Sequence, residues 1–131
     1  MIVEDPVFLT LGEVIEIHRD QIERYGGDPG VRDLGLLQSA MAMPAAGFGG
    51  RFLHTDLHEM AAAYLFHITQ NHPFVDGNKR TGAVASLVFL SLNDVELETD
   101  EEEFERIVLD VAQGKIEKAA VAEFFRKNSQ Y

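Results

Sequence analysis

The sequence predicts an all-α fold, a compact single-domain helical bundle with a central helical hairpin. Two stretches carry most of this prediction, because residues 57–70 and 83–92 are apolar on nearly every side. A helix that is hydrophobic all round is buried, so we expect both at the centre of the bundle. Alternating, strand-like patterns are confined to short passages. At 131 residues the chain is long enough for a single core, and we expect residues 1–131 to form one domain.

The first helix is predicted over residues 11–25. Thr10 and Glu13 have the spacing of a capping box, in which each side chain bonds the other residue's backbone N–H. Apolar residues then recur at helical spacing, and the pair Gly26-Gly27 ends the helix.

The next segments are less regular. Asp33 is expected to cap a short helix that ends before Pro44. The stretch 45–50 is too rich in glycine for a helix, and residues 51–55 are predicted to be extended, as a flap or half of a hairpin.

The central hairpin follows. Asp56 carries a capping signal that opens the helix 57–70. Proline disfavours the helical conformation for the residue before it, so His72 is expected where this helix ends. The second central helix, 83–92, extends backward so that residues 78–80 form its first turn.

The C-terminal part is predicted to add two more helices. Residues 93–94 break the second central helix, and residues 95–99 alternate as a short extended passage would. Thr99 is expected to cap the next helix. Gly114 then separates it from a last amphipathic helix, 116–126.

Composition excludes several functions. The chain has 22 acidic and 11 basic residues, a net charge of −11, so we expect no nucleic-acid partner. It has no cysteine, which excludes disulfides and thiolate metal sites and is compatible with a reducing compartment. We expect no membrane span, no signal peptide and a cytoplasmic location.

The most informative stretch is residues 72–81, HPFVDGNKRT, at the start of the second central helix. Lys79 and Arg80 in a first helical turn are electrostatically unfavourable, because a helix N-terminus is itself positive. The arrangement is favourable if that turn binds an anion. Backbone N–H groups of Gly77 and Asn78 and the two cations would then converge on phosphate.

Three further residues of this loop fit phosphoryl or nucleotidyl transfer to a protein hydroxyl. His72 can accept a proton near neutral pH and is the candidate general base. Asp76 can bind Mg²⁺ through one carboxylate, leaving other positions to phosphate and water. Phe74, an aromatic residue in a polar loop, is expected to anchor the loop in the core.

The stretch 72–81 resembles the motif of the Fic/Doc (Fido) superfamily, whose pattern is H-P-F-x-D/E-G-N-G/K-R. Residues 24–33, RYGGDPGVRD, and residues 34–44, LGLLQSAMAMP, are similar to the death-on-curing (Doc) branch. The resemblance spans most of the chain and implies the Fido fold.

The resemblance also implies residue roles. His72 would activate the target hydroxyl, and Asp76 would bind magnesium. Gly77 and Asn78 would form the anion hole, and Arg80 would clamp a phosphate.

Two positions depart from the adenylylating Fic enzymes. Lys79 stands where these usually have glycine, and Ala83 stands where they have a second arginine. Lys79 is the residue of the Doc branch, which uses ATP to phosphorylate a protein. The resemblance therefore implies a growth-inhibiting kinase that acts on a translation elongation factor, with AMP transfer as the alternative.

The resemblance bears on regulation too. Many Fic proteins carry an inhibitory helix with the pattern S/T-x-x-x-E-G/N. Residues 99–103 have the spacing, but Phe104 follows. We therefore expect inhibition in trans by a small antitoxin that folds as it binds.

Other interpretations remain open. His54 and His58 are four residues apart, which would suit a zinc hydrolase, but Thr55 stands where a metalloprotease needs glutamate. We expect instead a flap in which Leu53 and His54 guide a target peptide. A third possibility is a scaffold that binds a partner without catalysis, against which the intact His72 argues.

Overall fold

The structure, a computed structural model, describes residues 5–130. Within this range the chain forms six helices and four two-residue strands. The elements in chain order are α1 (Leu11–Tyr25), α2 (Leu34–Ala42), β1 (Gly47–Phe48), β2 (Arg51–Phe52), α3 (Leu57–Asn71), α4 (Asn78–Leu92), β3 (Glu96–Leu97), α5 (Glu101–Ala112), α6 (Lys118–Lys127) and β4 (Ser129–Gln130). The predicted all-α bundle with a central hairpin is confirmed.

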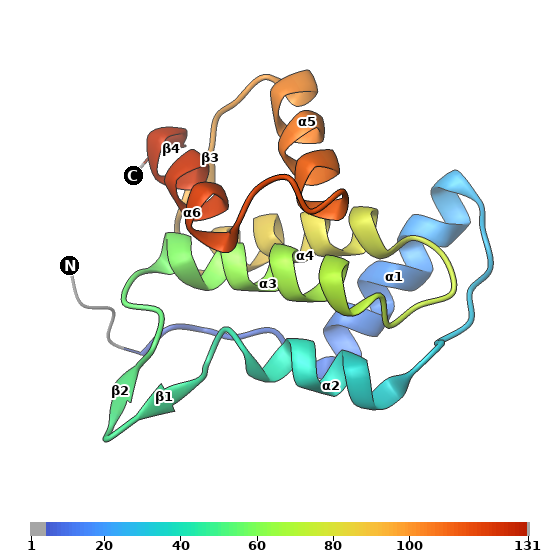
Figure 1. Cartoon of the computed structure of the whole chain (residues 1–131), viewed down its shortest axis with the longest axis horizontal. Helices are drawn as coiled ribbons and strands as arrows, with labels where there is room; N and C mark the ends of the chain where they lie inside the picture. The colour runs from blue at the N-terminus through green and yellow to red at the C-terminus, as the bar shows by residue number, and fades with distance from the viewer. Residues whose placement is uncertain (1–4, 131) are drawn as a thin grey trace.

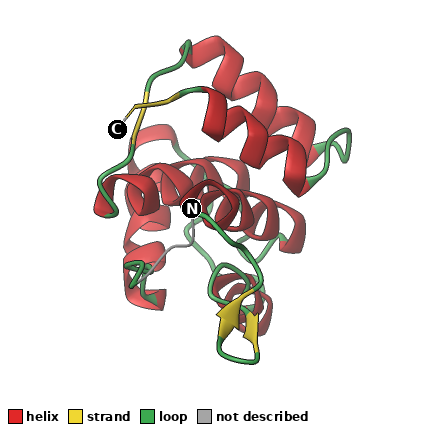
Figure 2. Ribbon diagram, turned by 90° about the vertical axis from the view of Figure 1, so that its left-hand side faces the viewer, coloured by secondary structure: helices red, strands yellow, loops and turns green. Residues whose placement is uncertain are grey.

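The bundle has three layers, with α3 and α4 in the middle (Figure 1). Helices α5 and α6 cover one side of this pair, and α1 and α2 lie on the other (Figure 2). The largest fully buried side chains include Tyr64, Phe74, Phe89 and Phe125, which come from α3, the loop after it, α4 and α6. The core therefore supports the α3–α4 connection directly.

The helix starts follow from local chemistry. Thr10 and Glu13 form the predicted capping box, with bonds of 3.1 and 2.8 Å to each other's backbone. Asp33 and Asp56 accept backbone N–H bonds of 3.0 and 2.8 Å at the starts of α2 and α3. Each cap satisfies a donor that the helix itself leaves without a partner.

One predicted cap is wrong. The residue that precedes α5 is Asp100 rather than Thr99, and it makes no side-chain capping bond. The Thr99 hydroxyl instead donates to the Asp100 carbonyl at 3.4 Å. Three glutamates in the first turn, at positions 101–103, provide the charge that a helix N-terminus favours.

Gly82 allows the two central helices to pack closely. A Cβ at this position would lie 2.9 Å from the Thr69 hydroxyl and 3.1 Å from the Leu65 carbonyl oxygen. A larger residue would therefore push α4 away from α3 and displace the loop between them.

The short strands form two antiparallel pairs. Strands β1 and β2 make a hairpin before α3, so the predicted extended passage has its partner inside the glycine-rich stretch. Strand β3 pairs with β4, a strand that the sequence did not predict, and this closes the α5–α6 unit. Among residues 5–130, no helix is long and apolar enough to cross a membrane.

Candidate active site

The loop from His72 to Gly77 connects the two central helices. His72 caps α3 in a left-handed conformation, with φ 52° and ψ 54°. Gly77 starts α4, also left-handed, at φ 80°. The loop is thus short, bounded by two sharp turns and carried by the two most buried helices, which fixes it rigidly.

Phe74 packs the loop into the core. Its side chain is fully buried, and its ring stacks on His18 of α1 at 3.7 Å between centroids and 6° between planes. His18 Nε2 lies 2.8 Å from the carbonyl oxygen of Asp76. Because a carbonyl only accepts, the imidazole donates this bond.

Asn78 closes the loop on itself. Its Oδ1 accepts the backbone N–H of Phe74 at 2.9 Å, and its Nδ2 donates to the carbonyl of Phe74 at 2.9 Å. The side chain is buried, and both its oxygen and its nitrogen bond the backbone of Phe74. It thus has a structural role in the loop that the sequence did not predict, beside the anion hole predicted for this residue.

The segment before α2 runs antiparallel to the loop. Val31 pairs with Phe74, and the N–H groups of Arg32 and Asp33 both donate to the carbonyl of Pro73, at 2.8 and 3.0 Å. The Arg32 guanidinium reaches the end of α3, where Nε donates to the carbonyl of His72 at 2.7 Å. The backbone of the loop is therefore tied down from α1 and from the α1–α2 connection.

Side chains of the loop face a cavity of about 680 Å³. Its lining consists of Thr69, His72, Val75, Asp76, Gly77, Asn78, Lys79, Arg80 and Ala112. The structure thus brings together a histidine, a carboxylate, two cations and the N-terminus of α4, which are the groups that the sequence singled out.

The charged groups of the cavity have backbone partners. Asp76 Oδ2 accepts the N–H of Asp28 at 2.8 Å. Arg80 Nη2 donates to the carbonyl of Gly26 at 3.0 Å, and its guanidinium lies 5.4 Å from the centre of the Tyr25 ring. Among residues 5–130, Lys79 has no hydrogen-bond or ion-pair partner. The first-turn N–H groups of α4 are not capped by any side chain of the described residues.

The predicted flap lies elsewhere. Leu53 and His54 precede α3, whereas His72 caps its other end, and Figure 1 shows the hairpin and the loop on opposite sides. A helix of 15 residues is roughly 22 Å long, so neither residue reaches the cavity. Leu53 is exposed, but His54 is buried. The structure therefore does not bring these two residues together with the loop, and a role for them in guiding a target stays a prediction.

His54 instead belongs to a separate cluster between α3 and α6. It lines a cavity of about 320 Å³ with Glu59, Lys118 and Arg126. Burial lowers the pKa of His54. Burial and then the charge of Lys118, whose Nζ lies 3.0 Å from His67 Nε2, lower the pKa of His67 to about 4. These histidines are therefore neutral in the fold near neutral pH.

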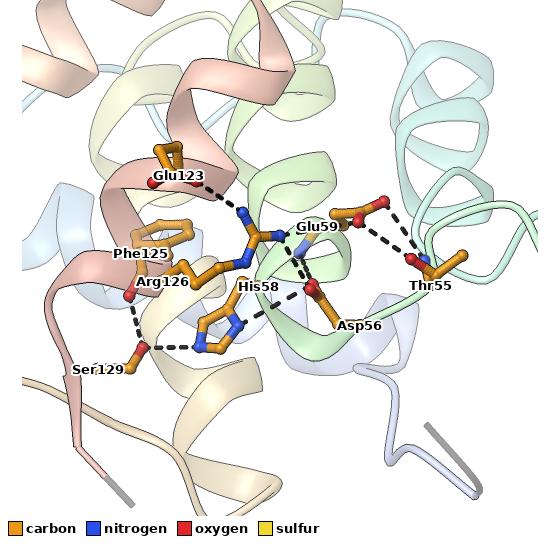
Figure 3. Close-up of polar contacts among 8 residues, drawn as sticks. All are labelled: Thr55, Asp56, His58, Glu59, Glu123, Phe125, Arg126 and Ser129. Carbon is orange, nitrogen blue, oxygen red and sulfur yellow. Dashed lines mark hydrogen bonds and ion pairs between the residues drawn. The ribbon is translucent and has the colours of Figure 1, made fainter. Parts of the chain in front are cut away.

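His58 packs at the same end of α3. Its Nε2 bonds the Ser129 hydroxyl at 2.8 Å, and its Nδ1 lies 4.0 Å from Asp56 (Figure 3). Residues 5–130 contain no group of three side chains placed to hold a metal ion. The zinc-hydrolase interpretation, which rested on His54 and His58, thus gains no support from the structure.

Sequence reasoning assigned no role to two residues that hold the loop. Arg32 and His18 contact the carbonyls of His72 and Asp76, from 40 and 58 residues away in sequence. The available signal was the match of residues 24–33 to the Doc branch, which indicated that the segment matters but not what it contacts.

Comparison with known proteins supports one family. The Fic/DOC family model matches residues 8–90. The chain is 35% identical over 115 residues to the protein kinase doc of Escherichia phage P1, covering 88% of this chain and 90% of that protein. It is 45% identical over 76 residues to the toxin Doc of Mycolicibacterium smegmatis (strain ATCC 700084 / mc(2)155), covering 58% of each chain.

Proposed function

The chain belongs to the Fic/DOC family, in its Doc branch, and on that premise we propose that it is a growth-inhibiting protein kinase. It would transfer the γ-phosphate of ATP to a hydroxyl group of a protein. The names of the two relatives, a protein kinase and a toxin, support this choice.

One observation carries the proposal: a single cavity places His72 and Asp76 beside the cationic N-terminus of α4. Phosphoryl transfer needs positioning and charge stabilisation more than covalent chemistry, and these are what the cavity offers. Lys79 and Arg80 supply positive charge, and the uncapped amides of the first turn supply donors for phosphate oxygens.

The residues present fit a triphosphate. Gly77 has φ 80°, and an added Cβ would lie 3.2 Å from the side chain of Ile22 and 3.5 Å from Arg80 Nη2, so glycine allows the sharp turn that brings the first amides of α4 to the cavity. Asp76 would hold Mg²⁺ through its carboxylate, a single-ligand arrangement that suits a cation whose other ligands are phosphates and water. When bound, Mg²⁺ neutralises phosphate charge.

His72 would act on the target hydroxyl. Its imidazole accepts the hydroxyl proton as the oxygen attacks the γ-phosphorus, and the bond to the β-phosphate oxygen breaks to release ADP. Among residues 5–130 the His72 side chain has no hydrogen-bonding partner. It is therefore available to a substrate.

The biological setting follows from the same family. We propose that the protein works in the cytoplasm on a translation elongation factor, and that a small antitoxin restrains it in trans. The relative named as a toxin supports the existence of such an inhibitor.

The decisive experiment incubates the protein with Mg²⁺, bacterial lysate and ATP labelled at either the α or the γ position. We expect label on protein from the γ position only, with purified elongation factor as the first target tested. Label from the α position alone would identify the protein as an AMP transferase. Labelling from neither would contradict the enzymatic proposal and favour a binding scaffold.

A further inference from the structure

The side chain of Arg32 forms a fork on the end of α3. Its Nε donates to the carbonyl of His72 at 2.7 Å, and its Nη2 donates to the carbonyl of Asn71 at 3.0 Å. The last carbonyls of a helix have no partner within the helix. A planar guanidinium can bond two of them at once, and its charge is favourable at a helix C-terminus.

The fork bonds the chain at a residue whose backbone conformation is unfavourable. His72 is left-handed, a conformation that residues other than glycine rarely adopt. It also precedes Pro73, which further restricts its backbone. The orientation of that backbone sets the direction in which the imidazole points. Among residues 5–130 the imidazole has no hydrogen-bonding partner of its own that could hold it in place.

We propose that Arg32 is a positioning residue, which fixes the His72 backbone so that the imidazole faces the reacting hydroxyl. The inference rests on the proposed function, because the direction of His72 matters most if it is the base. Displacement of a catalytic group by about 1 Å can lower a rate up to 100-fold.

The role of the Arg32 side chain can be tested without disturbing the fold. Arg32 is exposed, so its removal leaves no internal cavity. Its backbone N–H bonds the carbonyl of Pro73 at 2.8 Å whatever the side chain is. Substitution therefore removes the two bonds to the end of α3 and leaves the pairing of the two segments in place.

The experiment compares Arg32→Ala, Arg32→Lys and the control Arg19→Ala. Arg19 is also exposed, and within residues 5–130 its side chain bonds only Glu16, at 3.2 Å. Two quantities are measured: the NMR signals of the His72 ring, assigned with a His72→Gln variant, and the kinetics of phosphate transfer to purified elongation factor.

For Arg32→Ala we expect shifted or broadened His72 ring signals, and kcat lower by about 10-fold with the KM for ATP within about twofold. Arg32→Lys keeps the charge but loses the planar fork that bonds the two carbonyls in a fixed geometry, so kcat should recover in part. Arg19→Ala should match the wild type in both measurements.

Two results would overturn the role of Arg32. One is a His72 ring signal in Arg32→Ala that coincides with the wild-type signal. The other is a kinetic loss that lies in the KM for ATP rather than in kcat. A wild-type protein that transfers no phosphate would instead refute the proposed function, and the His72 signals would still decide whether Arg32 orients the ring.

Discussion

The two ends of α3 both carry dense polar groups, but these groups are bonded in different ways. At the N-terminal end, side chains bond one another. Arg126 Nη2 lies 2.9 Å from Asp56 Oδ2, and His58 bonds the Ser129 hydroxyl at 2.8 Å (Figure 3). The Ser129 hydroxyl in turn donates to the carbonyl of Phe125, so that it accepts from His58. Here the polar groups join α3 to α6 and satisfy each other.

At the C-terminal end, the loop side chains bond only backbone groups among residues 5–130. Asp76 accepts from the N–H of Asp28, Arg80 donates to the carbonyl of Gly26, and Asn78 bonds Phe74. Opposite charges are present but do not pair with each other. The loop is held rigidly through its main chain while its charges stay available to a ligand.

This is the difference that we expect between a polar cluster that stabilises a fold and one that binds a ligand. Similar residue types occur at both ends, so composition alone does not tell them apart. What differs is the bonding partner. A charged side chain that pairs with an opposite charge is neutralised, whereas one that bonds a neutral carbonyl or N–H group keeps its net charge. The comparison predicts that substitutions at the two ends affect different measurements.

The largest effect is expected for His72→Ala. Loss of a general base should lower the rate of γ-phosphate transfer by about 10²–10⁴-fold, with ATP affinity and the melting temperature little changed. The matched control is His58→Ala at the other end of α3, which should lower stability by about 1–3 kcal/mol and leave the rate per folded molecule intact. Transfer rates and thermal unfolding measure both. Full activity, or toxicity that survives His72→Ala, would favour binding over catalysis.

Asn78→Ala should lower the stability of the fold, because the side chain closes the loop through the backbone of Phe74. It leaves the N–H and the carbonyl of Phe74 without partners in a buried loop, which should cost about 2–4 kcal/mol. The melting temperature should fall by roughly 10 °C. Asn78→Asp keeps the acceptor but sets a buried carboxylate oxygen against the carbonyl oxygen of Phe74, so its loss in denaturant unfolding should be at least as large. If Asn78→Ala were as stable as the wild type, the loop would not depend on this closure.

Much of the fold could be predicted because its signals are local. The caps at Thr10, Asp33 and Asp56 each involve residues three apart, and the burial of α3 is evident from its composition. The loop was identified for the same reason, since its chemistry is concentrated in residues 72–81.

What could not be predicted depends on distant pairs. Arg32 meets the end of α3 across 40 residues, and β4 pairs with β3 across the whole α5–α6 unit. The sequence Asp76-Gly77-Asn78 indicates a turn, but the partner of the Asn78 amide is known only once the chain folds back. The position of Leu53 and His54 relative to the loop was likewise not predictable, because proximity in sequence to α3 does not say at which end of the helix a residue lies relative to the loop.

A smaller effect on stability is expected from pH, through His67 on the side of α3 that faces α6. The pKa of His67 is lowered to about 4, so between roughly pH 6.5 and pH 4 the unfolded chain binds a proton that the folded chain does not. Stability should therefore fall as pH decreases through this window and be flat above it. The His67 contribution should be about 1–2 kcal/mol, since the side chain is partly exposed.

His67→Gln tests this directly, because glutamine keeps an acceptor for Lys118 and does not titrate in this range. The variant should lose less stability than the wild type between pH 7 and pH 4.5 in urea unfolding. Between pH 7 and pH 8 the two should respond alike. An unchanged acid loss would mean that other groups, such as His54, dominate.

The smallest effect is expected for Arg126→Gln, and it decides whether the two ends of α3 are independent. The Arg126 side chain is 42% exposed, so water and salt screen its pairs with Asp56 and Glu123. We expect a loss of about 0.5–1 kcal/mol in urea unfolding, smaller still in 1 M salt. A double-mutant cycle with Asp56→Asn should assign most of the loss to that pair.

Phosphate transfer per folded molecule should not change in Arg126→Gln, because the cluster is roughly 22 Å from His72. If Arg126→Gln were fully folded but transferred phosphate more slowly, α3 would transmit strain from one end to the other. The two polar clusters would then not be independent.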